Sequence, residues 1–290
     1  MIGRETLSDV RDALVEARHG ATSYFRRLAN RSQLAPVEAR DRDIAAGLER
    51  HGAYSTSLDA LAASGSRELM QASDRLFDEM ARRKPKEGGK DYMIAADPDL
   101  ITNYPEILRW GLNERFLAIA ENYIGLPVAY RGVLARIDMP DGTVRETRLW
   151  HLDQEDSRIL KIVVYVSDVD DDGGPFEYLP ADTRQPRHLV HGSKKRVDDE
   201  EAFDEAAPES ARGAVVGPRG TVGFVDTCRI LHRGRLPLNG SRRSLFFAYN
   251  SRWPTRPSHC GPMFVVDRFK AQAGALSVRQ TAALDFGYGR

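Results

Sequence analysis

The second part of the chain consists of short β-forming runs separated by turns, which narrows the folds open to it. From Pro127 onward, Gly and Pro clusters punctuate runs rich in Val, Ile, Phe and Tyr. The runs predicted as strands are 128–138, 143–153, 158–169, a short one before Pro180, 220–234 and 241–252. Because no helical pattern separates these runs, we expect an antiparallel sandwich or barrel rather than βαβ units.

The first part of the chain has helical periodicity instead. Apolar residues recur at helical spacing in 5–30, 66–84 and 103–127. Pro105 near the start and Gly125 at the end divide and stop the third region, which we expect to form two short helices. We expect one domain over 1–290, with residues 1–126 mostly helical, a β core over 127–255 and a C-terminal segment over 256–290.

Composition excludes several classes of function. The 42 basic and 42 acidic residues balance, so no overall field favours nucleic acid or an anionic membrane. No run approaches a membrane span, and the N-terminus lacks the apolar core of a signal peptide. Cys228 and Cys260 are too few for a disulfide framework. We therefore expect a cytoplasmic protein that binds neither nucleic acid nor membrane; its oligomeric state is not readable from the sequence.

The stretch RLWHLDQED puts His151 and Asp153 two residues apart. On a strand, residues i and i+2 point to the same face, so both side chains would project together while Leu152 points away. His232, at the end of the run 220–234, is the candidate third ligand. Two imidazoles and one carboxylate form the ligand set of non-haem Fe(II) oxygenases, although zinc accepts similar ligands.

An arginine eleven positions beyond His232 helps to distinguish an iron site from a zinc site. By alternation, Arg243 shares a face with Leu245, Phe247 and Tyr249. An arginine among core aromatics is costly unless it meets an anion, and guanidinium pairs bidentately with carboxylate. A dicarboxylate such as 2-oxoglutarate, held by the metal at one end and by Arg243 at the other, would explain both features. The opposite phase, with Arg242 inward, is the alternative.

These motifs occur in the order typical of one family. Trp150, His151-Leu-Asp153, Gly174-Pro175, Leu179-Pro180, His232 and Arg243 follow one another between about 128 and 253. This stretch resembles the phytanoyl-CoA dioxygenase family of Fe(II)/2-oxoglutarate oxygenases. At Pro180–Arg184 the sequence PADTR departs from the family's PGSH, which puts transfer of a substrate from relatives in doubt.

The resemblance implies a mainly β fold with flanking helices: a double-stranded β-helix, or jelly roll, like that of cupins. It also implies that His151, Asp153 and His232 bind Fe(II), that Arg243 binds the distal carboxylate of 2-oxoglutarate, and that O2 is the co-substrate. In related halogenases the acid is replaced by Gly or Ala. Asp153 therefore favours hydroxylation or another oxidation of a small molecule, with release of succinate and CO2.

Five further residues are candidates for lining the site. Arg136 and Tyr165 are expected to contact 2-oxoglutarate, and Arg131, Trp150 and Lys161 to line the substrate cavity. Each also has an ordinary structural explanation: an exposed strand arginine for Arg131 and Arg136, a core aromatic for Trp150 and Tyr165, and an amine at a sheet edge for Lys161.

The mixed-charge insertion over about 190–213 interrupts the β pattern. We expect an exposed and partly helical surface loop there, with a mobile cover over the site as the alternative. His188 and His191 are expected to be loop histidines in solvent.

Three functions are compatible with these sequence features. The first is a 2-oxoglutarate-dependent oxygenase that acts on a small molecule, with natural-product biosynthesis as a candidate setting. The second is a non-catalytic cupin-like binding protein, and the third is a zinc-dependent hydrolase. A pseudoenzyme has no need of both Asp153 and a buried arginine, and a hydrolase offers no reason for the arginine.

Overall fold

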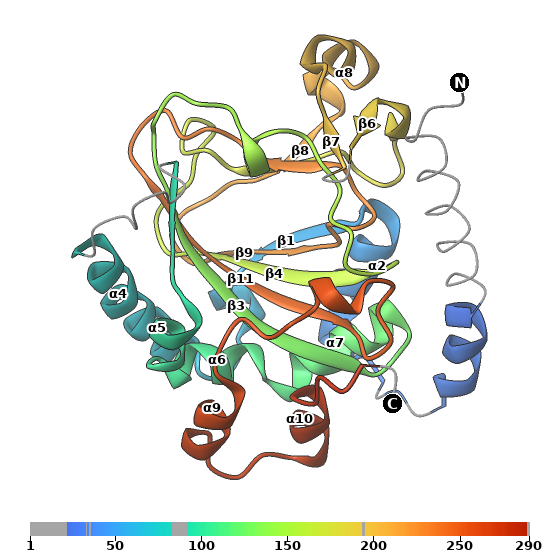
Figure 1. Cartoon of the computed structure of the whole chain (residues 1–290), viewed down its shortest axis with the longest axis vertical. Helices are drawn as coiled ribbons and strands as arrows, with labels where there is room; N and C mark the ends of the chain where they lie inside the picture. The colour runs from blue at the N-terminus through green and yellow to red at the C-terminus, as the bar shows by residue number, and fades with distance from the viewer. Residues whose placement is uncertain (1–21, 33, 35, 83–91, 193–194, 289–290) are drawn as a thin grey trace.

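Two antiparallel sheets face one another, and helices cover the outer face of the larger sheet (Figure 1). This computed structural model describes residues 22–288, except 33, 35, 83–91, 193 and 194. Helices α4 to α7, α9 and α10 lie below the large sheet in Figure 1, and α8 lies above the small one. The predicted mainly β fold with flanking helices is confirmed.

The large sheet has six strands and supplies one wall of the interior. In spatial order these are β1 (Ala53–Ser57), β9 (Thr221–Val225), β4 (Ile159–Tyr165), β11 (Arg242–Ser251), β3 (Val128–Asp138) and β2 (Met93–Ala95). The small sheet has the order β10 (His232–Gly234), β5 (Phe176–Tyr178) and β8 (Gly213–Val215). A hairpin of β6 (Val190–His191) and β7 (Arg196–Val197) lies in the insertion.

Short helices connect and cover the sheets. They are α2 (Arg42–His51), α3 (Leu58–Leu61), α4 (Ser66–Arg82), α5 (Pro98–Thr102), α6 (Pro105–Gly111), α7 (Glu114–Ile124), α8 (Glu200–Ala206), α9 (Val266–Gln272) and α10 (Val278–Ala283). Side chains cap several of them: Asp97 accepts a hydrogen bond from Leu100 N at 2.8 Å at the start of α5. Gly125 ends α7 with a φ of 78°, a conformation that glycine adopts without strain.

Alternation along β11 separates two environments. Leu245, Phe247 and Tyr249 are buried in the core between the large sheet and the helices. The intervening residues of the strand, Arg242, Phe246 and Ala248, line a cavity between the two sheets. Because both faces of this strand are covered, its apolar residues do not by themselves reveal which face looks into the cavity.

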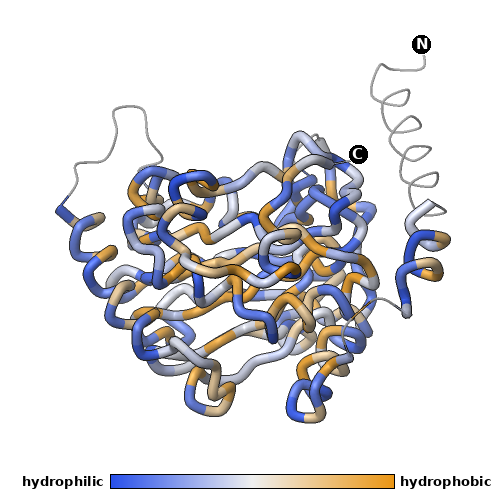
Figure 2. Tube along the Cα trace, turned by 90° about the horizontal axis from the view of Figure 1, so that it is seen from below, coloured by the Kyte–Doolittle hydropathy of each residue, from blue (hydrophilic) through white to orange (hydrophobic). Residues whose placement is uncertain are grey.

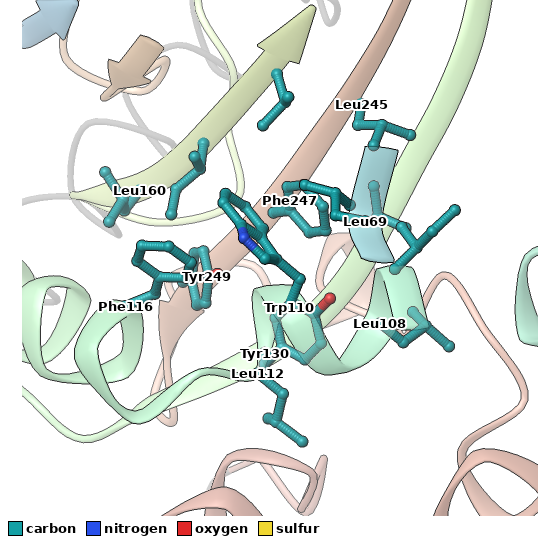
Figure 3. Packing of buried hydrophobic residues seen from close by; sticks show 14 of the residues in the cluster. Leu69, Leu108, Trp110, Leu112, Phe116, Tyr130, Leu160, Leu245, Phe247 and Tyr249 are labelled. Atoms are coloured by element: carbon teal, nitrogen blue, oxygen red, sulfur yellow. The ribbon is translucent and has the colours of Figure 1, made fainter. Parts of the chain in front are cut away.

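Trp110 lies at the centre of the core between sheet and helices (Figure 3). Its ring is 4.5 Å from that of Phe116 and 4.9 Å from that of Phe247, and its indole N–H donates to Ser66 Oγ at 3.1 Å. Helix α4 shows why the helices dock on this core: hydrophilic and hydrophobic residues alternate along it in Figure 2. Its buried residues include Leu69, Leu76 and Met80, on one face.

The helical predictions agree with the structure where it describes them. Within the predicted region 66–84, residues 66–82 form α4 and 83–84 lie outside the described residues, and 103–127 contains two helices, α6 and α7. Of the predicted helix 5–30, residues 22–30 are helical and 1–21 lie outside the described residues. The mostly helical first part also contributes β1 and β2, which pair with β9 and β3 of the large sheet.

Two strand predictions are wrong. Residues 143–153 form a 3-10 turn (Glu146–Arg148) and irregular backbone, with isolated bridges from His151 to Arg196 and to His232. The run 220–234 divides into β9 and β10, which belong to different sheets. The reason is a tight turn at Asp226, whose carboxylate accepts from Cys228 N at 3.1 Å and Arg229 N at 3.2 Å.

The insertion is more ordered than a solvated loop. Val197 and Phe203 are fully buried, and the Phe203 ring stacks on Trp150 at 4.7 Å. The insertion is partly helical, as expected, because it contains α8. The expected exposure is wrong for this part, since α8 packs against the segment that carries His151. Among the described residues, no helix is both long and apolar enough to cross a membrane.

Truncation of Trp110 tests the importance of this core. We expect Trp110→Ala to lower the free energy of unfolding by about 3–5 kcal/mol, because it empties a buried site among aromatic rings. Leu238, which is 60% exposed, provides the control. Leu238→Ala should change stability by less than about 0.5 kcal/mol. Urea unfolding of both variants makes the comparison, and equal stability losses would contradict the assignment of Trp110 to the core.

Candidate metal centre

His151 and His232 are joined through their backbones. His151 N donates to His232 O at 3.0 Å, and His232 N donates to His151 O at 3.1 Å. This reciprocal pair forms a single antiparallel bridge, with the two imidazole rings 4.2 Å apart between centroids. Residues 81 positions apart in the sequence are thereby held side by side.

Each imidazole is oriented by a carbonyl two residues before it. His151 Nδ1 lies 2.8 Å from Leu149 O, and His232 Nδ1 lies 3.1 Å from Ile230 O. A carbonyl only accepts, so each Nδ1 carries the proton and each Nε2 offers a lone pair. Orientation of this kind is typical of metal-binding histidines.

Asp153 completes the group. Its oxygens lie 3.9 Å from His151 Nε2 and 3.8 Å from His232 Nε2. One ligand atom from each of the three residues lies within 4.8 Å of the others. Asp153 N donates to Thr227 O at 2.9 Å, which ties the carboxylate to the turn between β9 and β10.

The electrostatics keep the three ligands in the forms that bind metal. Burial lowers the pKa of His151, and burial together with His151 lowers that of His232 to about 3, so both rings are neutral at pH 7. Burial disfavours ionisation of Asp153, but the ammonium of Lys161 and the two imidazoles outweigh it and hold the carboxyl pKa below its usual range. Two neutral imidazoles and one carboxylate fit a divalent first-row metal, with positions left for other ligands.

A cavity of about 230 Å³ extends from this group between the sheets. Its lining comprises Arg131, Leu134, Arg136, Thr147, His151, Asp153, Glu155, Lys161, Phe176, Thr227, His232, Gly234, Arg242, Phe246, Ala248 and Met263. The Phe176 ring stacks on His232 at 5.3 Å and covers one side of the group. The cavity therefore combines a metal-binding group with apolar walls and a few charged side chains, the usual make-up of a small-molecule site.

Two buried guanidinium groups that line this cavity, those of Arg242 and Arg136, share one buried carboxylate, that of Asp138. Arg242 is 2% exposed and donates to Asp138 Oδ2 from Nη2 at 2.8 Å and from Nε at 3.2 Å. Arg136 donates to the other oxygen of the same carboxylate. Burial raises the pKa of Asp138, but the charges of Arg242 and Arg136 prevail and lower it. One negative charge thus faces two positive charges, which leaves a buried excess of positive charge.

The expected orientation of Arg243 is wrong. Arg243 does share a face with Leu245, Phe247 and Tyr249, as alternation predicts, but that face is covered by helices and does not line the cavity. Its side chain is 36% exposed, and its Nη1 lies 3.8 Å from Asp78 of α4. The aromatic residues mark the core under the helices, so the alternative phase, with Arg242 inward, is the one observed.

The other predicted residues fall into two groups. Arg136, Arg131 and Lys161 line the cavity. Tyr165 and Trp150 do not: Tyr165 is buried beside it, with its hydroxyl donating to Val215 O at 2.8 Å, and Trp150 packs behind His151 against α8. Both aromatics are core residues, which was the structural explanation open to them.

Charged residues beyond Asp153 form a chain of ion pairs. Lys161 Nζ contacts the Asp153 carboxylate directly and lies 3.9 Å from Glu155 Oε1. Arg131 Nη1 lies 3.0 Å from the same Glu155 oxygen. Opposite charges therefore alternate along this wall, and each neutralises the next.

Sequence reasoning missed Asp138, Glu155, Thr147 and Phe176 as parts of the site. A usable signal existed for Asp138: it lies two residues after Arg136 on one strand and so shares its face. For Thr147 and Phe176 the sequence offered no comparable signal. Thr147 reaches the cavity from a 3-10 turn and Phe176 from a short strand of the small sheet, and neither position follows from a local pattern.

Comparisons with known proteins support the fold. No family model matches the chain, and no curated protein sequence matches it either. Among solved structures, the non-haem α-ketoglutarate-dependent epimerase SnoN from nogalamycin biosynthesis is similar, with a TM-score of 0.50 and 18% identity over 75% of this chain and 86% of that one. EctD from S. alaskensis, solved with 2-oxoglutarate and 5-hydroxyectoine, has a TM-score of 0.52 and 22% identity over 79% and 83%. The chain therefore has the double-stranded β-helix fold of 2-oxoglutarate-dependent oxygenases, as predicted.

Asp226 holds the turn that anchors Asp153. Its fully buried carboxylate accepts a hydrogen bond from the Tyr123 hydroxyl at 2.7 Å and two from backbone amides of the turn. Burial raises the pKa of this carboxyl to about 6, although these hydrogen bonds oppose the change. The folded protein thus binds the Asp226 proton more tightly than the unfolded chain does.

This difference predicts how stability depends on pH. Between about pH 4 and pH 6 the folded state retains a proton that the unfolded state has lost, so the Asp226 contribution falls as pH rises through this window. We expect the loss to be on the order of 2 kcal/mol and to be absent in Asp226→Asn. Urea unfolding of both proteins at pH 4.5 and pH 7 gives the difference. A constant gap between them at both pH values would show that Asp226 does not titrate this way.

Proposed function

We propose that this protein is an Fe(II)/2-oxoglutarate-dependent oxygenase that oxidises a small molecule. The observation that carries the proposal is one cavity with two features: the group of His151, Asp153 and His232, and a buried excess of positive charge at Arg242 and Arg136. The first suits a ferrous ion, and the second suits the distal carboxylate of a diacid.

Arg242 takes the role that the sequence had suggested for Arg243. A carboxylate entering the end of the cavity would offset the charge that Asp138 leaves unbalanced between Arg242 and Arg136. The guanidinium of Arg242 is held by Asp138 and by Gly174 O, which keeps it oriented before any ligand arrives. Such preorganisation lowers the entropic cost of binding.

Iron with 2-oxoglutarate and O2 supplies an oxidant able to remove hydrogen from an unactivated carbon, with conversion of 2-oxoglutarate to succinate and CO2. The residues of the chain have simpler roles. The two Nε2 atoms and the Asp153 carboxylate bind the ion, while Arg242 and Arg136 orient the diacid. Phe176, Phe246 and Leu134 provide apolar walls that exclude water from the reacting atoms.

A zinc-dependent hydrolase would use the same three ligands but would leave the charge at Arg242 and Arg136 without a role. A non-catalytic cupin would need neither. Hydroxylation is the outcome we favour, because Asp153 occupies a coordination position. The similarity to SnoN, an enzyme of nogalamycin biosynthesis, makes a natural-product substrate a reasonable class to screen.

Loss of one ligand tests the metal centre. We expect His232→Ala to abolish Fe(II)-dependent formation of succinate and to weaken Fe(II) binding by more than the roughly 10–100-fold cost of losing an outer-shell partner. His188→Ala is the matched control, because His188 is exposed and lies outside the cavity. Anaerobic equilibrium dialysis measures binding, and succinate is quantified after O2 is admitted. Zinc-supported turnover without succinate would instead favour the hydrolase.

The adjacent arginines allow a sharp test of the co-substrate site. We expect Arg242→Met to raise the KM for 2-oxoglutarate by roughly tenfold or more, because a buried charge-assisted pair is lost. Arg243→Met should leave the KM within about twofold, because Arg243 contacts α4 instead.

Arg242→Lys serves as a second variant should Arg242→Met fail to fold. It keeps the charge but not the paired donors, and should also raise the KM. Circular dichroism verifies the fold of each variant. A KM that rises in Arg243→Met and not in either Arg242 variant would overturn this part of the proposal.

A further inference from the structure

A second cavity, of about 350 Å³, opens on the other side of Asp153. It shares Asp153 with the cavity described above, so a molecule occupying it would lie against the metal centre. Its walls come from four separate parts of the chain, and the residues that line it are Leu152, Asp153, Gln154, Asp156 and Ser157, then Arg187, Val190 and Lys195, then Cys228 and Arg229, and finally Thr255 and Arg256.

Backbone contacts hold the insertion against the metal-binding segment. Leu152 N donates to Lys195 O at 3.1 Å, and Lys195 has a φ of 48°, in the left-handed region that non-glycine residues seldom adopt. On the opposite wall, Thr227 O, in the turn that carries Arg229, accepts a hydrogen bond from Asp153 N. The position of these basic residues relative to Asp153 is thus determined by the fold and not by their side chains alone.

Basic side chains dominate this second cavity. Arg187, Lys195, Arg229 and Arg256 line it, whereas Asp153 and Asp156 are its only acidic lining residues among the part of the chain described. Asp153 belongs to the metal centre.

The other acid, Asp156, is committed to the backbone around it. It accepts from Ser251 Oγ at 2.6 Å and from Thr255 N and Oγ1 at 3.2 Å each. It is buried at 8% exposure, so little of its charge is offered to the cavity.

Two of these basic groups, Arg187 and Arg229, donate to backbone carbonyls. Arg187 donates to Arg229 O at 2.8 Å, and Arg229 donates to Leu48 O at 3.0 Å. Arg256 donates to the amide oxygen of Gln154. Over the described residues, no carboxylate lies within ion-pair distance of Arg187, Lys195 or Arg229. Positive charge converging on one cavity favours an anion.

We propose that the substrate carries a phosphate or carboxylate group and that this second cavity binds it, through Arg187, Lys195, Arg229 and Arg256, while the carbon to be oxidised lies at the metal centre. The inference rests on the proposed function, because it assigns a substrate class to the same site. In the wall of alternating charges, each cation has its own carboxylate: Arg131 pairs with Glu155, and Lys161 pairs with Asp153. The second cavity is therefore the place where binding of a substrate anion is most favourable.

Anion binding to the metal-free protein tests this without any turnover. Isothermal titration calorimetry at fixed ionic strength uses two probes, inorganic pyrophosphate and propane-1,2,3-tricarboxylate. We expect at least one probe to bind, with the tighter one identifying the anionic group. In Arg187→Gln/Lys195→Gln its dissociation constant should rise by roughly tenfold or more, because two charge-assisted interactions are lost.

A matched control removes one arginine and one lysine elsewhere. Arg67 in α4 and Lys270 in α9 are both exposed and lie outside the cavity, so Arg67→Gln/Lys270→Gln should bind the probe as the parent protein does. Should the first double variant lose its fold in a thermal melt, Arg187→Gln alone provides the comparison, with a rise of about threefold expected. The proposal is overturned if neither probe binds, or if the variants lacking Arg187 bind as tightly as the control.

The two proposals fail in different ways. Absence of iron-dependent succinate formation with intact anion binding would refute the oxygenase and leave an anion site. Succinate formation without anion binding would refute the substrate class alone.

Discussion

The reciprocal backbone hydrogen bonds between His151 and His232 are the constraint on which the candidate site depends. They connect an irregular segment after a 3-10 turn to the first residue of β10 and bring the centroids of the two imidazole rings to within 4.2 Å, with the rings tilted to one another. Since each Nδ1 is engaged by a carbonyl of its own segment, the two Nε2 atoms are left to face Asp153. Neutral rings beside an ionised carboxylate follow from burial and from Lys161, and this is the state that a divalent metal requires.

Charge is distributed unevenly around this centre, and the basic residues of the two cavities have different partners. At one end, Arg242 and Arg136 share the single carboxylate of Asp138, which leaves an excess of positive charge there. On the other side of Asp153, Arg187 and Arg229 donate to backbone carbonyls. An enzyme that must hold a diacid co-substrate and an anionic substrate around one ion would need this separation, because like charges placed together in one cavity would repel.

The spacing of His151 and Asp153, and the presence of a distant His232, could be recognised in the sequence because the chemistry of the ligand set is specific. The local reason for their convergence could not. Residues 143–153 do not form the strand that alternation suggested, and the two side chains approach through a bridge and a turn instead. The structure thus brings the three predicted ligands together, but without the strand that the sequence suggested for the first two.

The choice between Arg242 and Arg243 was wrong for a different reason. Alternation correctly separated Arg242 from Arg243, but the choice of face was wrong because both faces of β11 are buried. One face lies under helices and the other under the second sheet, and aromatic residues suit either. Only the helices packed on Leu245 and Phe247 distinguish the two.

The sequence by itself determined the class of fold and the donor atoms, because period-2 runs, turn residues and ligand types are local properties. Tertiary structure alone decided which arginine lies beside Asp138, that Trp150 supports the site from behind, and that the insertion brings Lys195 against Leu152. Each of these depends on contacts between segments distant in the chain, and local preferences carry no information about which of two buried faces a distant segment will cover.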